Sequence, residues 1–124
     1  MGGRGSAGAK GGAGGVQNWS LAKVGALASG NVPGLTVEQE YQMKEVNGQY
    51  TAQDRAVAAQ YGQTPAQYQA HITADIAKKG ILSPARVDEW TATRNGLSEG
   101  YHRYAAARKL GRKTMPVINT GHGS

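Results

Sequence analysis

The sequence predicts an all-α fold, a small bundle of three to five helices with Gly-rich disordered ends, on three observations. Four segments between residues 36 and 110 each begin with a helix N-terminal signal. Apolar residues follow these signals at spacings of three and four. Glycines gather elsewhere, with eight of the 19 in the first fifteen residues. We therefore expect a helical domain at 16–111, between a flexible Gly-rich arm at 1–15 and a basic, then Gly-rich, tail at 112–124.

The first helix candidate spans residues 16–30, with Trp19, Val24 and Leu27 as its apolar contacts. Two glycines inside the segment weaken its helix propensity. Residues 31–34, with the sequence Asn-Val-Pro-Gly, then predict a turn, because Pro fixes φ and Gly accepts positive φ.

Two short helices are expected next. Thr36 and Gln39 form a capping-box pattern, in which each side chain covers a backbone amide that has no partner within the helix. We expect this helix to stop at 47–48, where the sequence is Asn-Gly. Thr51 caps the second helix, which runs to about Tyr61.

The third helix begins where Thr64 precedes Pro65, since Pro is favoured at the first helical position. Tyr68, Ile72 and Ile76 recur every four residues along it. Lysines occupy its last turn, where they complement the helix dipole, and Gly80 closes it.

A Ser83-Pro84 pair repeats the start signal for the fourth helix. Spacings of three and four place these residues on one helical face: Val87, Trp90, Arg94, Leu97, Tyr101, Tyr104 and Arg108. The spacing favours one helix over 84–110, whereas Gly96 and Gly100 favour two joined helices, and both interpretations stay open. Beyond it, the apolar segment 115–118 either docks back on the body or contacts a partner.

Charge is distributed unevenly along the chain. Residues 36–100 hold all eight carboxylates, whereas residues 101–124 hold five Lys or Arg and no acid. The basic C-terminal segment therefore predicts an acidic partner, most directly nucleic acid or a nucleoprotein assembly, or an acidic protein surface. We expect these residues to make the contact: Tyr101, Arg103, Tyr104, Arg108, Lys109, Arg112 and Lys113.

The two tyrosines in this set allow two interpretations. Aromatic rings between cations can stack on bases while the cations neutralise phosphates. On a helix, however, Tyr101, Tyr104 and Arg108 share the apolar face while Arg103 points away. The rings then pack against the third helix, and the cations are solvated or pair with the helix dipole.

The segment 73–94 resembles the helix-turn-helix of DNA-binding regulators. Ala77 takes the place of the small residue of the first helix, and Leu82, Val87 and Trp90 fall where that motif packs its second helix. The resemblance implies a recognition helix that enters the major groove of DNA. A plain hairpin of two capped helices explains the same residues.

The opening Met-Gly-Gly-Arg-Gly-Ser, residues 1–6, resembles the start of small proteins encoded by phages and prophages. This resemblance implies a role in a virion or against a host protein. It provides no functional residue.

No catalytic or metal-ligating pattern is present in the sequence. Cysteine is absent, and His71 and His102 have no second ligand at metal-binding spacing. The adjacent carboxylates Asp88 and Glu89 diverge on a helix, so they form no acid–base pair. We therefore expect no enzyme, no metal and no cofactor, and no segment is apolar enough to span a membrane.

The sequence thus predicts a non-catalytic binding protein, with a homo-oligomer or larger assembly as an option because its apolar core is thin. The alternatives are a phage structural or assembly component, whose ends thread between subunits, a helix-turn-helix regulator, and an inhibitor of a host protein. We expect the host cytoplasm or the virion as its location.

Overall fold

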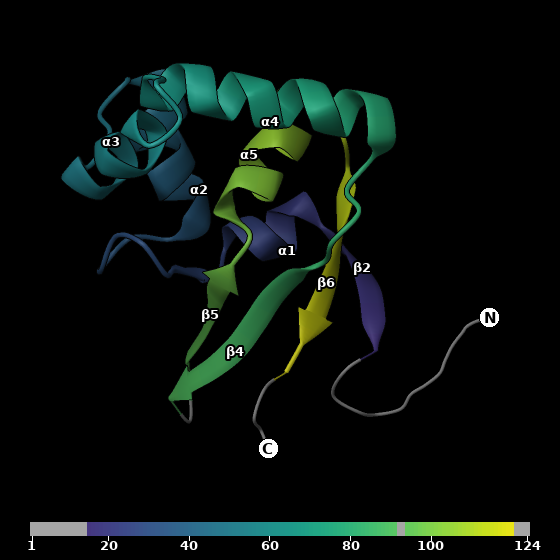
Figure 1. Cartoon of the computed structure of the whole chain (residues 1–124). Helices are drawn as coiled ribbons and strands as arrows, with labels where there is room; N and C mark the ends of the chain where they lie inside the picture. Colours follow the sequence, from purple (N-terminus) through teal and green to yellow (C-terminus); the bar gives the residue numbers. More distant parts are fainter. Residues whose placement is uncertain (1–14, 92–93, 121–124) are drawn as a thin grey trace.

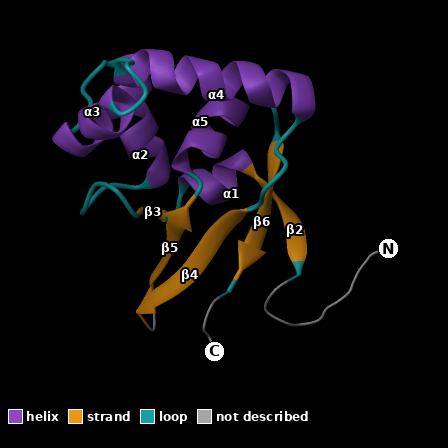
Figure 2. Cartoon of the chain, in the orientation of Figure 1, coloured by secondary structure: helices purple, strands orange, loops and turns teal. Residues whose placement is uncertain are grey.

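The computed structural model describes residues 15–91 and 94–120, and its fold is mixed α/β. Figure 2 shows the helices gathered together on one side of a twisted sheet, with the longest of them lying across the top. The all-α prediction is therefore wrong. The predicted arm at 1–15 lies outside the described residues except for Gly15, and so does the end of the chain from residue 121.

The sheet has five strands in the order β2-β6-β4-β5-β3 (Figure 1). Strand β6 lies parallel to β4 and antiparallel to β2, β5 lies antiparallel to β4, and β3 lies parallel to β5. In chain order the strands are β2 (Val16–Ser20), β3 (Ala28–Ser29), β4 (Ala85–Thr91), β5 (Arg94–Glu99) and β6 (Thr114–Asn119).

Three capping boxes begin the helices that the sequence predicted after residue 36. Thr36, Thr51 and Thr64 each accept a hydrogen bond from the amide three residues on, and the side chain there accepts one in return. These start signals are confirmed. The helices are α1 (Leu21–Gly25), α2 (Val37–Tyr41), the π-helix η1 (Gln42–Val46), α3 (Ala52–Ala59), α4 (Pro65–Lys79) and α5 (Tyr101–Lys109).

Strands β4 and β5 replace the first half of the segment 84–110, which was expected to form one helix or two joined helices. Val87 pairs with Leu97 across the two strands, and both side chains are buried. Along β4, buried Ala85 and Val87 flank the exposed Arg86, which is the alternation of a strand with one buried face. The second helix of the predicted helix-turn-helix is therefore a strand, and only α5 retains the helical prediction.

The first helix candidate is also shorter than predicted. Only Leu21–Gly25 is helical, and Trp19 lies in β2, where it pairs with Met115. Gly25 permits a close approach, because a Cβ there would lie 2.6 Å from the Tyr104 hydroxyl. The glycine thus lets α1 pack against α5.

The segment 115–118 docks back on the body, the first of its two expected places, and it does so as part of strand β6 of the sheet. Met115 and Val117 in β6 are 1% and 0% exposed, and they belong to the core with Val24, Val37 and Tyr104. The folded body therefore extends beyond residue 111, and this segment is not free to thread between subunits. Among the described residues, no helix is both long and apolar enough to cross a membrane.

Candidate functional site

Helix α5 follows Gly100, whose backbone conformation and close packing both require a glycine. Gly100 has φ +128° and provides no side-chain hydrogen bond to the helix. A Cβ on Gly100 would lie 2.5 Å from the Cβ of Ala85, so the turn from β5 into α5 packs directly on β4. The first turn of α5 contains no acidic residue. Its amides, which have no partner within the helix, therefore keep their partial positive charge.

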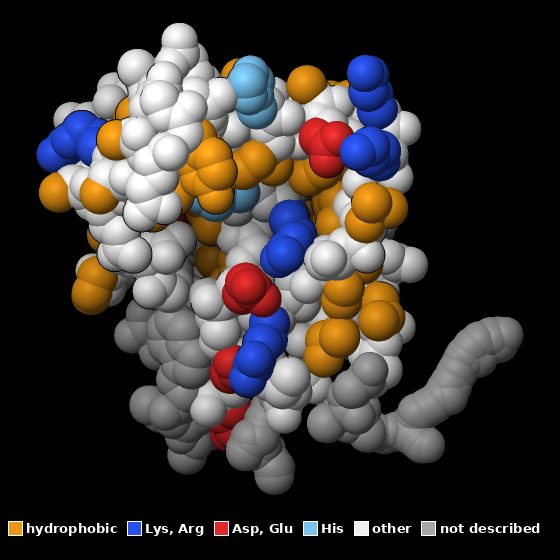
Figure 3. All heavy atoms as spheres, viewed as in Figure 1, with side chains coloured by type: hydrophobic (Ala, Val, Ile, Leu, Met, Phe, Trp, Pro, Cys, Tyr) orange, Lys and Arg blue, Asp and Glu red, His pale blue; other side chains and the backbone are white. Residues whose placement is uncertain are grey.

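A cavity of about 590 Å³ lies beside this first turn of α5. Its walls come from one face of α4, the loop that follows α4, and the residues from Glu99 to Arg103. Figure 3 shows charged and histidine side chains along this side of the molecule, below α4. We call it the outer cavity. Its polar lining includes His71, Asp75, Ser83, Glu99, His102 and Arg103.

Arg103 is the half-buried cation of this cavity. Its Nη1 lies 3.4 Å from the position that a Cβ on Gly100 would take, so the guanidinium folds back over the start of α5. Within residues 15–91 and 94–120, Arg103 makes no ion pair and no hydrogen bond. A guanidinium carries five N–H donors in a fixed fork, and those of Arg103 are available to a ligand.

The other cations of α5 have partners within the molecule. Arg108 donates Nε and Nη2 to the two oxygens of Glu38, at 2.9 and 2.6 Å. This pairing, assisted by a hydrogen bond from the Tyr104 hydroxyl, lowers the pKa of Glu38 to about 2. Lys109 lies 3.3 Å from Glu45. Two of the five predicted contact cations are therefore neutralised by the protein's own acids.

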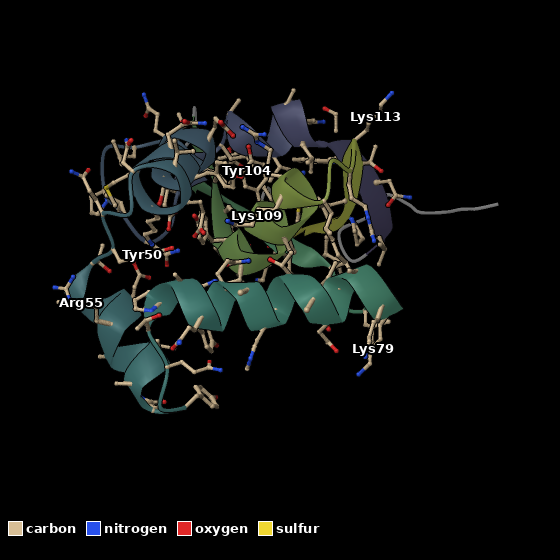
Figure 4. All side chains as sticks on the ribbon, turned by 90° about the horizontal axis from the view of Figure 1, so that it is seen from above. Tyr50, Arg55, Lys79, Tyr104, Lys109 and Lys113 are labelled. Carbon is tan, nitrogen blue, oxygen red and sulfur yellow. The ribbon has the colours of Figure 1, made fainter. Side chains whose placement is uncertain are left out.

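The remaining predicted residues do not form one surface with Arg103. Arg112 donates to the carbonyl of Ile76 at 3.4 Å. Lys109 and Lys113 are both exposed, and they lie well apart in the view of Figure 4. Tyr101 and Tyr104 are 5% and 1% exposed. Their rings pack in the core, so the interpretation that they stack on bases does not hold.

A second, smaller cavity of about 220 Å³ lies on the other side of the same turn. We call it the inner cavity. The two cavities share five lining residues, namely Tyr68, Glu99, Gly100, Tyr101 and His102. The first turn of α5 is therefore the wall between them.

The inner cavity is lined by a buried ion cluster. Lys44 Nζ lies 2.5 Å from Glu40 Oε2 and 3.0 Å from Asp54 Oδ2. Lys44 and Glu40 are 1% and 0% exposed, and Glu40 also accepts hydrogen bonds from Ser29 and Asn31. Every charge of this cluster has a partner, as buried charges require. The cluster therefore joins α2, η1 and α3, and it offers no free group to a ligand.

His102 lines both cavities, and Gln69 of α4 fixes its orientation. The Gln69 amide nitrogen donates to the His102 carbonyl at 3.0 Å and to Thr73 Oγ1 at 3.2 Å. The Gln69 oxygen therefore faces His102 Nδ1, 2.7 Å away, and accepts a hydrogen bond from the Nδ1–H group. Burial, the largest effect, lowers the pKa of His102 below its ordinary value. The neutral ring thus carries its proton on Nδ1.

The sequence predicts Arg103 as a contact residue, but it does not predict the groups that surround Arg103 in the fold. The partner of His102, Gln69, lies 33 residues earlier in the chain, so no local pattern in the sequence reveals their contact. In the sequence, Gly100 indicates a break between two joined helices, although a glycine before an apolar helical segment also indicates a turn. Among the described residues, no group of three or more His, Asp or Glu side chains is arranged to hold a metal ion.

Comparisons with known proteins give only weak structural similarities. No family model matches the chain, and no curated protein matches it. Sulfiredoxin from Arabidopsis thaliana is similar over 84% of this chain and 82% of its own, with 16% identity and a TM-score of 0.45. The C-terminally truncated chromosome-partitioning protein ParB from Caulobacter crescentus, complexed with CTP-gamma-S, is similar over 86% of this chain, with 20% identity and a TM-score of 0.46. The match spans 44% of that ParB chain.

Proposed function

We propose that this protein binds an oxyanionic ligand, in the first instance a phosphate group, in the outer cavity, with Arg103 as its main contact. One observation carries the proposal: Arg103 is half-buried at the cavity wall and, within the described residues, lacks the carboxylate partner that Arg108 and Lys109 have. A partly buried guanidinium without a partner is costly, and an anion removes that cost.

The surroundings of Arg103 add to its attraction for an anion. The start of α5 lies under the guanidinium, and the positive end of the helix dipole favours negative charge there. Ser83 supplies a hydroxyl to the same cavity. We expect a phosphate in this cavity to draw its hydrogen bonds from these groups.

Two carboxylates at the cavity oppose this attraction. Asp75 is balanced by Lys79 at 3.2 Å, whereas Glu99 is exposed and lines both cavities. These two carboxylates favour an anion that lies close to Arg103 and far from Asp75 and Glu99. They also provide a test, because removing one charge at Glu99 should strengthen binding.

Titration calorimetry with inorganic pyrophosphate at neutral pH tests the proposal. We expect Arg103→Ala to weaken binding by at least tenfold, and Arg103→Lys to recover part of the loss, since Lys keeps the charge without the fork. Lys113→Ala is the matched control, because it removes the same charge outside the lining of both cavities. Equal affinity of Arg103→Ala and the unaltered protein would refute the proposal.

Nucleic acid is the second candidate ligand. Arg112 and Lys113 have no carboxylate partner within the described residues, so they can contact phosphates of a long strand at a place apart from Arg103. Contacts with several phosphates release counterions, so affinity must fall steeply as salt rises. A salt-independent affinity, or none for any nucleic acid, would leave the small oxyanion as the ligand.

A further inference from the structure

We propose that His102 makes oxyanion binding in the outer cavity stronger as pH falls, and that Gln69 is the positioning residue that gives His102 this role. The inference rests on the proposed function and adds a regulator to the same site. It follows from the position of one ring, from the proton that this ring carries, and from the groups around it.

The ring of His102 is held firmly at the junction of the two cavities. Tyr68 and Tyr101 pack edge-on against it, with ring centres 5.2 and 5.6 Å away. Gln69, which is 1% exposed, grips both the backbone carbonyl and Nδ1 of the same residue. These contacts leave Nε2 as the atom of the ring that can gain a proton.

Nε2 of His102 has no hydrogen-bond partner among the residues that the structure describes. In the neutral ring it offers a lone pair, which would repel an oxyanion that reached it, because both are acceptors. Protonation converts it into an N–H donor and adds one positive charge to the lining that already contains Arg103. The neutral and charged rings therefore have opposite effects on the same ligand.

The charges around the ring, together with its burial, decide at which pH His102 takes up its second proton. Burial and the charge of Lys44 favour the neutral ring, whereas Asp54, Glu45 and Glu40 favour the charged one, and burial is the largest effect. The ring is therefore neutral at neutral pH. The titratable and charged groups on the elements packed around it are Tyr101 and Arg103 on α5, Tyr68, His71 and Asp75 on α4, Glu99 on β5, Lys44 and Glu45 on η1, Glu40 on α2 and Asp54 on α3.

Binding and protonation are coupled in both directions. If the charged ring binds the anion better, the bound anion must raise the pKa of His102 by the same free energy. We expect the affinity for sulfate to rise by about tenfold from about pH 8 to about pH 5, the scale of a coupling between neighbouring sites. Sulfate is the suitable probe because it stays a dianion over this range, whereas pyrophosphate takes up protons.

His71 lines the same cavity and must be separated from His102. Its side chain is exposed and its Nδ1 lies 2.7 Å from the Gln63 amide. The two variants His71→Gln and His102→Gln therefore form a matched pair. We expect the pH dependence of sulfate affinity to persist in His71→Gln and to disappear in His102→Gln.

Histidine NMR on the full chain supplies a readout that does not depend on the variants. In the unaltered protein, nitrogen shifts should show His102 protonated at Nδ1, and saturating sulfate should raise its titration midpoint. Gln69→Ala should shift the neutral ring toward the Nε2-protonated form, an effect that loss of packing alone would not produce. A midpoint unmoved by sulfate, or a pH dependence retained in His102→Gln, would overturn the proposal.

The two proposals fail in different ways. If Arg103→Ala abolishes sulfate binding while pH has no effect, the site stands and the role of His102 is wrong. If sulfate and pyrophosphate bind at no pH, or bind Arg103→Ala equally well, the proposed function is wrong and the role of His102 is overturned with it.

Discussion

The Arg108 guanidinium holds the Glu38 carboxylate by two parallel hydrogen bonds, Nε to Oε1 at 2.9 Å and Nη2 to Oε2 at 2.6 Å. The pair joins α5 to α2 across 70 residues of sequence. The hydroxyl of Tyr104 donates to the same carboxylate, and the guanidinium lies 4.6 Å from the ring centre of Tyr41. A cation expected to face a partner is thus part of the fold.

This contact predicts acid sensitivity. The pKa of Glu38 falls from 4.5 to about 2 on folding, because Arg108 donates to the charged form. A lowered carboxyl pKa means that the unfolded chain binds protons more readily, so the contribution is complete above about pH 4.5 and is lost as pH falls toward 2. We expect Glu38→Gln to reduce this loss of stability between pH 5 and pH 2 in denaturant unfolding.

At neutral pH the same variant should cost about 1–2 kcal/mol of unfolding free energy, because the pair is bidentate but one-third exposed. Asp75→Asn is the matched control. Asp75 pairs with Lys79 on the surface, where both side chains are 59% exposed, so its loss should cost less than about 0.5 kcal/mol. Equal costs for the two variants would contradict the assigned role of Glu38.

Local signals in the sequence predicted where α2, α3 and α4 begin. The capping boxes at Thr36, Thr51 and Thr64 depend on residues three apart, so each can be recognised without knowledge of the fold. The strands depend on partners far away: β6 pairs with β2 through contacts such as Met115 with Trp19. No local pattern reveals such a pairing.

The segment 84–99 shows why the fold class was wrong. Val87 and Leu97 lie ten residues apart, a separation compatible with one helical face and equally with opposite positions in a hairpin. Gly96 was a sign against the helix, and the structure shows that it lies inside a strand. Arg103 was predicted as a contact residue, whereas the sequence did not predict the cavity that α4 and the loop after it form around Arg103.

Gly100 should tolerate no side chain. Its φ of +128° lies in the region that favours glycine. A Cβ on Gly100 would lie 2.5 Å from the Cβ of Ala85 and 3.0 Å from its Cα. We expect Gly100→Ala to lower the unfolding free energy by about 3 kcal/mol or more, since strain and overlap add. Gly111→Ala is the control, because Gly111 has φ +71° with open space around it and should cost about 1 kcal/mol. Similar losses for both would show that the contact with Ala85 is unimportant.

The buried Lys44 should be essential to stability. It lies between Glu40 and Asp54 and is 1% exposed. Lys44→Met should cost about 3–5 kcal/mol in denaturant unfolding, because it leaves two carboxylates without their cation. Adding Glu40→Met should recover part of that loss, since the double variant removes one of the two carboxylates that have lost their cation. A double variant less stable than Lys44→Met would show that Glu40 is held chiefly by Ser29 and Asn31.

Glu99 should oppose the proposed ligand from the rim of the outer cavity. Its carboxylate is exposed and lies on the strand that leads into α5, four residues before Arg103. Because solvent screens an exposed charge, we expect Glu99→Gln to raise the affinity for pyrophosphate by only about two- to fivefold in calorimetry, and less at high salt. Glu89→Gln removes the same charge from β4, outside the lining of both cavities, and should leave the affinity unchanged. An equal gain in both variants would mean that net charge, and not the position of Arg103, attracts the anion.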